Sequence, residues 1–199
     1  MHIDLLALIG TVGTFGILAI VFAESGLFFG FFLPGDSLLF TAGLLAATGV
    51  LPFWLLILTL PLAAVLGDSV GYWFGKKVGP ALFSRPESRF FKPKYALEAQ
   101  KFFLKHGKKA LVLARFLPLI RTFVPIVAGV GKMPYRDFIS YNIIGGIAWT
   151  LSMFLLGFGL GNIIPNPERY LYPIVVAIIL ISFIPVVREY LHSKKTTTP

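Results

Sequence analysis

The chain has 199 residues, of which 56% are hydrophobic and only 14% are charged, and its mean hydropathy is +0.82. This composition excludes a soluble globular domain and predicts one membrane domain over 1–199. The net charge of +9 does not indicate a nucleic-acid partner, because residues 76–109 hold ten Lys and Arg against two Glu. Such a cluster between apolar segments is typical of a cytoplasmic loop. The absence of cysteine excludes disulfides and thiolate metal sites.

The apolar segments and their breaks predict an all-α polytopic membrane protein. In chain order, we expect a transmembrane helix at 5–22, a re-entrant helical hairpin at 23–48, a transmembrane helix at 53–75, a basic cytoplasmic loop with an amphipathic helix at 76–109, a second re-entrant hairpin at 110–131, and transmembrane helices at 135–161 and 170–187. The positive-inside rule places the N- and C-termini in the cytoplasm.

The first hairpin is predicted from a break at Pro34-Gly35 within an apolar run. Arms of about eleven residues are about 16 Å long as helix, so they reach only the midplane of the bilayer. Asp36 follows the break and is expected to cap the second arm, which Gly49 ends. Capping alone is one interpretation of Asp36. Glu24 has no routine structural use in an apolar helix, so it is a functional candidate.

The helix expected at 53–75 carries Gly67, Gly71 and Gly75 at every fourth position, which predicts a face for close helix contact. Asp68 lies beside this face. It is either a third carboxylate of a polar pocket or the partner of a nearby Lys or Arg, and both interpretations stay open.

The second hairpin contains two arginines, Arg115 and Arg121, inside an apolar segment that Pro118 interrupts. Arginine at bilayer depth costs several kcal/mol unless it faces a cavity or an opposite charge, so both are candidates for a binding site. The alternative is that they only extend toward the interface. Thr122 is expected to cap the second arm, with Pro125 in its first turn.

The two hairpins are predicted to open to opposite sides of the membrane, which is the pattern of inverted-repeat transporters. In that arrangement Glu24 and Asp36 would approach Arg115 and Arg121. Opposite charges would offset part of the cost of burying each other, and carboxyl groups that change protonation would suit proton coupling.

At these residues the chain resembles the DedA family, also called SNARE-associated or VTT-domain proteins. The resemblance covers about residues 5–190 and rests on Glu24-x-Gly26, Leu33-Pro-Gly-Asp36, Gly67-Asp68-x-x-Gly-Tyr-x-x-Gly75, and Arg115-Phe-x-Pro-x-x-Arg121 followed by Gly129. It implies a multi-pass protein of the bacterial plasma (inner) membrane with two opposed re-entrant hairpins. It also implies lipid movement between leaflets, notably of undecaprenyl phosphate, with Glu24 and Asp36 as the essential acidic pair and Arg115 and Arg121 as the essential arginines.

Our hypothesis from sequence is a flippase for a polyprenyl phosphate lipid, linked to the proton motive force. Arg115 and Arg121 would bind the phosphate, Glu24 and Asp36 would gate by titration, and Asp68 would be accessory. The expected partners are the lipid, protons and an anionic membrane surface; a homo-oligomer stays open. We expect no cofactor, no metal and no enzymatic activity. A phospholipid scramblase and a proton-coupled exporter of small cations are the alternatives.

Overall fold

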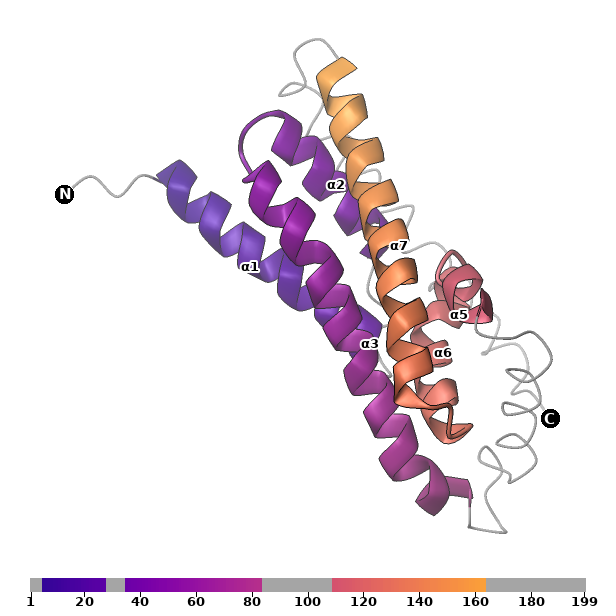
Figure 1. Ribbon diagram of the computed structural model, residues 1–199. Coiled ribbons are helices and arrows are strands. Elements are labelled where there is room, and N and C mark those ends of the chain that lie inside the picture. Colours follow the sequence, from indigo (N-terminus) through magenta and orange to yellow (C-terminus); the bar gives the residue numbers. More distant parts are fainter. Residues whose placement is uncertain (1–4, 28–34, 84–108, 164–199) are drawn as a thin grey trace, which may run out of the picture. The chain divides into compact units, whose positions relative to one another are not determined.

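The computed structural model describes residues 5–27, 35–83 and 109–163. All regular secondary structure within these ranges is helical (Figure 1). The helices are α1 (Leu5–Gly26), α2 (Gly35–Ala47), α3 (Phe53–Phe83), α5 (Lys109–Ala114), α6 (Pro118–Val130) and α7 (Tyr135–Ile163). The amphipathic helix expected after residue 83 and the transmembrane helix expected at 170–187 lie outside the described residues.

The predicted ends of the first and third helices were wrong. The first helix continues through Glu24 to Gly26 instead of ending at residue 22, so Glu24 belongs to α1 and not to a hairpin arm. The third helix continues to Phe83, so the start of the expected loop is helical. In both cases a polar or basic residue was taken as the end of a helix, although neither Glu nor Lys opposes helical backbone geometry.

The break between α5 and α6 was predicted correctly, whereas the start of the second arm was not. Leu117 is extended, with φ −108° and ψ 105°, and α6 begins at Pro118. The ring of a proline disfavours helical geometry in the residue before it, and its missing N–H costs nothing at the first helical position. Thr122 and Pro125 therefore lie inside α6 and do not form its first turn.

The chain divides into two compact units. Of the described residues, the first comprises 5–17, 35–56 and 153–163, and in it α2 packs against the end of α7. A Cβ at Gly43 would clash with the backbone of Phe154, and one at Gly157 would clash with that of Phe40. Glycine at both positions thus lets the two helices approach closely.

Helix α2 begins one residue before Asp36, which lies in its first turn and not at the cap. A carboxylate there still interacts favourably with the helix dipole. Gly49 ends the α2 segment as predicted: its φ is +78°, which favours glycine, and its N–H donates to the carbonyl of Ala46 at 3.2 Å.

Of the described residues, the second unit comprises 18–27, 57–83 and 109–152. Its centre is the predicted glycine face of α3. A Cβ at Gly67 would clash with the carbonyl of Phe22 on α1, and a Cβ at Gly75 would clash with the carbonyl of Ile126 on α6. The face therefore brings α1 and α6 against α3, which confirms the close helix contact predicted from the every-fourth spacing.

Within the described residues, two helices are long and apolar enough to cross a membrane, namely the 53–78 part of α3 and the whole of α7. Helices α2 and α6 have 13 residues each, or about 20 Å, which is less than a hydrocarbon core of about 30 Å. The described residues thus form helices as their only regular structure, two of them candidate membrane spans, while the re-entrant path of the hairpins and the inverted repeat stay predictions.

Candidate functional site

Two buried ion pairs lie in the second unit. Asp68 of α3 pairs with Arg115, which follows α5, and Glu24 of α1 pairs with Arg121 of α6. Glu24 is 1% exposed and Asp68 is 4% exposed. Charges buried this deeply are tolerated only when they are paired. Within each pair, the carboxylate and the arginine therefore hold each other in place.

Local features of the sequence bring these four residues together. Gly67 directly precedes Asp68 and lets α3 approach α1 closely at Phe22 and Ser25, the part of α1 that carries Glu24. The turn at Arg115 is closed by its N–H, which donates to the carbonyl of Val112 at 3.3 Å, and Pro118 then starts a new helix. The break places Arg115 between α5 and α6. The direction of its side chain is therefore not set by the regular spacing of residues in either helix.

Arg115 lies in a tight polar cradle on α7. Its guanidinium donates to the side-chain oxygen of Asn142, whose amide nitrogen donates to the carbonyl of Val65 at 3.1 Å. A Cβ at Gly145 would lie 2.8 Å from Cδ of Arg115, and a Cβ at Gly146 would lie 3.3 Å from its Nη1. The two glycines therefore provide the space in which the arginine side chain lies.

Arg121 has an aromatic neighbour in addition to its carboxylate. Its Cζ lies 4.5 Å from the centroid of the Trp149 ring, and this ring is 2% exposed. A guanidinium over an indole gains about 0.5–2 kcal/mol, and stacking leaves the N–H groups at its edge directed toward acceptors. Trp149 thus holds Arg121 without using its hydrogen-bond donors.

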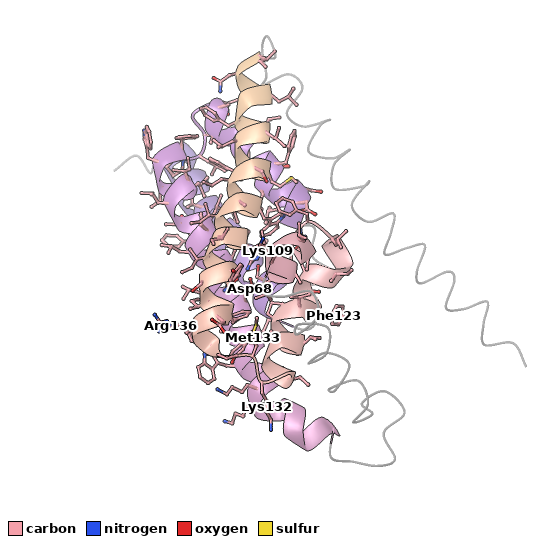
Figure 2. All side chains as sticks on the ribbon, turned by 45° about the vertical axis from the view of Figure 1, so that its right-hand side comes forward. Asp68, Lys109, Phe123, Lys132, Met133 and Arg136 are labelled. Carbon is pink, nitrogen blue, oxygen red and sulfur yellow. The ribbon has the colours of Figure 1, made fainter. Side chains whose placement is uncertain are left out.

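A small cavity lies beside both arginines. It has room for about one water molecule. Its lining combines four polar side chains with four apolar ones, namely Asp68, Leu111, Arg115, Arg121, Val124, Pro125, Phe138 and Asn142. Figure 2 shows Asp68 within the group of helices, whereas Lys132 and Arg136 lie at the start of α7.

The site has two positive and two negative groups, so its net charge is zero when all four are ionised. Loss of one negative charge would leave a buried guanidinium without its counterion, which is costly unless another anion enters. Guanidinium groups suit phosphate because their donors form a planar fork. Within the described residues, no three His, Asp or Glu side chains are arranged to hold a metal ion.

The structure brings together four of the five residues singled out from the sequence. Glu24 approaches Arg121 as expected, and Asp68 is the partner of Arg115. Asp36 belongs to the first unit, so its predicted approach to the arginines stays a prediction.

Sequence reasoning missed Asn142 and Trp149. Asn142 carried a readable signal, since a buried amide in an apolar helix needs a partner, whereas Trp149 is one aromatic among many.

These features define an all-helical membrane protein with a buried, charge-balanced arginine–carboxylate site. Residues 33–159 match the family model described as the VTT domain. The chain belongs to this family, the DedA family of membrane proteins.

Three of the relatives are bacterial proteins, two of which are named as membrane proteins. The chain is 43% identical over 178 residues to Protein DedA of Escherichia coli K12, covering 88% of this chain and 81% of that protein. It is 46% identical over 172 residues to an uncharacterized membrane protein of Mycobacterium tuberculosis, covering 85% and 75%. It is 36% identical over 156 residues to the inner membrane protein YghB of Escherichia coli K12, covering 78% and 71%. No solved structure matches the chain.

Proposed function

We propose that this protein is a flippase for a polyprenyl phosphate lipid such as undecaprenyl phosphate, and that transport is linked to the proton motive force. The observation that supports the proposal is the pair of arginines beside one cavity, each neutralised by a carboxylate. Two guanidinium groups can bind a phosphate group, and two carboxyl groups can release them by taking up protons.

The proposed cycle starts from the closed site. The cavity is too small for a phosphate group while both pairs are formed, because it has room for about one water molecule. Protonation of Glu24 removes the negative charge opposite Arg121, and a phosphate then replaces it. Deprotonation restores the ion pair and expels the phosphate. Proton and phosphate are therefore expected to bind together, so that a proton gradient can drive the lipid across the membrane.

The direct test is binding of farnesyl phosphate, a short polyprenyl phosphate, to the detergent-purified protein. We expect saturable binding that Arg115→Ala/Arg121→Ala loses and that phosphatidylethanolamine and phosphatidylglycerol do not displace. A matched control, Lys77→Ala/Arg136→Ala, removes two exposed cations outside the cavity and should bind as the wild type does.

The alternatives give different results. Displacement by ordinary phospholipids would favour a phospholipid scramblase. Absence of binding in a folded wild-type protein would contradict phosphate binding by Arg115 and Arg121. The better explanation would then be a proton-coupled exporter whose small cations bind to Glu24 and Asp36.

A further inference from the structure

Asn142 connects α7 to both α3 and Arg115. Its side chain is buried, and its amide nitrogen donates to the carbonyl of Val65 at 3.1 Å. The same carbonyl accepts the hydroxyl of Ser69 at 2.8 Å. Because the amide nitrogen is directed to Val65, the amide oxygen must face Arg115, from which it accepts a hydrogen bond.

Asn142 and Asp68 contact the same atom. Both approach Nη2 of Arg115, Asp68 from α3 and Asn142 from α7. The two side chains have nearly the same shape, but only Asp68 carries a charge. The guanidinium is therefore held by two oxygen acceptors and neutralised by one negative charge.

We propose that Asn142 is a positioning residue for Arg115 and that its neutrality sets the charge balance of the site. This inference rests on the proposed function, since it explains how an anion site arises. With a neutral residue at 142, loss of one negative charge leaves the site with one excess positive charge, which a phosphate can satisfy. With a carboxylate at 142, the same loss would leave no excess and therefore no anion site.

The test moves the charge between the two positions. Asn142→Asp adds a second carboxylate at Arg115, and Asp68→Asn/Asn142→Asp keeps one carboxylate but transfers it from α3 to α7. Asn162→Asp is the matched control, because it makes the same substitution on the same helix at an exposed position. Farnesyl phosphate affinity is measured at about pH 6, because the proposed cycle raises the wild-type affinity as pH falls, and the thermal unfolding temperature at about pH 8, where carboxyl groups are ordinarily ionised.

We expect Asn142→Asp to weaken farnesyl phosphate binding at least about tenfold. The exchanged variant should bind within about threefold of the wild type. Asn142→Asp should lower the unfolding temperature by about 5 °C, and the exchange should recover more than half of that loss. Recovery should be incomplete, because the amide donor to Val65 is still missing. Asn162→Asp should leave affinity and unfolding temperature unchanged.

Two results separate this inference from the proposed function. If no variant binds farnesyl phosphate, the wild type included, but the exchange still recovers the unfolding temperature, the lipid assignment is wrong and the role of Asn142 stands. If the exchanged variant is as unstable and binds as weakly as Asn142→Asp, Asp68 and Asn142 do not share Arg115 and the inference is overturned.

Discussion

At the scale of single residues, the two arginines are held in different surroundings. Arg115 lies between Asp68 and Asn142 against two glycines of α7, and Arg121 lies between Glu24 and the face of Trp149. The Glu24 pair joins α1 to α6, two elements that are far apart in the chain. Titration of this carboxylate would therefore change a contact between helices as well as a charge.

The first prediction concerns Glu24→Gln, which removes the negative charge at nearly constant shape. In the proposed cycle, wild-type affinity for farnesyl phosphate rises as pH falls, because protonated Glu24 releases Arg121. Glu24→Gln imitates the protonated state, so its affinity should be high at every pH. At about pH 8 it should exceed that of the wild type by about tenfold, the low end of the coupling between buried charges.

The measurement is affinity as a function of pH for wild type, Glu24→Gln and Asp137→Asn. The last variant removes a carboxylate from the first turn of α7, outside the residues that line the cavity, and should keep the wild-type pH dependence. A pH dependence in Glu24→Gln equal to that of the wild type would show that another group controls binding.

Part of this site could be predicted from the sequence, and the rest could not, for physical reasons. Charged residues in apolar segments are costly, so Arg115, Arg121 and Glu24 could be singled out from local composition alone. The approach of Glu24 to the arginines followed only from the predicted meeting of the two hairpins, and its specific partner could not be chosen, because Glu24 and Arg121 are 97 positions apart. Asp68 could be either a pocket carboxylate or the partner of a Lys or Arg. The sequence left both interpretations open, because the choice depends on which helix the glycine face of α3 contacts.

At the scale of helices, close approach of backbones determines where the site forms. Gly129 of α6 faces α3, and a Cβ there would clash with the carbonyl of Tyr72. Helix α6 also carries Arg121, so a displaced α6 would move this arginine away from Glu24. The sequence predicted the α3 side of this contact from the spacing of its glycines, but the partner helix could not be read from spacing.

Gly129→Ala should therefore destabilise the protein by about 1–3 kcal/mol, the usual cost of inserting a methyl group into a packed contact. Gly159→Ala is the matched control, because nothing lies within 4 Å of a Cβ at that helical position. It should be neutral or stabilising by up to about 1 kcal/mol, since alanine favours helix over glycine. Thermal unfolding in detergent measures both; equal stability of the two variants would contradict the close α3–α6 contact.

The helix boundaries show the same division between local and distant causes. The break before Pro118 and the turn at Gly49 were predicted, because proline and glycine act on the backbone where they stand. The continuation of α1 through Glu24 was missed. An acidic residue in an apolar helix is acceptable when it has a partner, and that partner, Arg121, comes from a different part of the chain.

At the scale of the whole molecule, the orientation in the membrane follows from the distribution of charge. The basic residues after α3 predict that this end of the helix lies in the cytoplasm. Helix α7 has 29 residues, or about 43 Å, which exceeds a hydrocarbon core of about 30 Å, so both of its ends can reach the interfaces. The end at Asn162 is then expected to face the outside.

The chain contains no cysteine, so a single introduced cysteine reports its own position without a background signal. Lys77→Cys and Asn162→Cys both replace exposed residues near helix ends. In intact cells, a membrane-impermeant maleimide should label Asn162→Cys and not Lys77→Cys, and in inside-out vesicles the labelling should be reversed. Labelling of both variants from one side would contradict the predicted orientation, because α3 and α7 would then not cross the membrane in opposite directions. The opposed hairpins, on which an inverted repeat depends, would be contradicted as well.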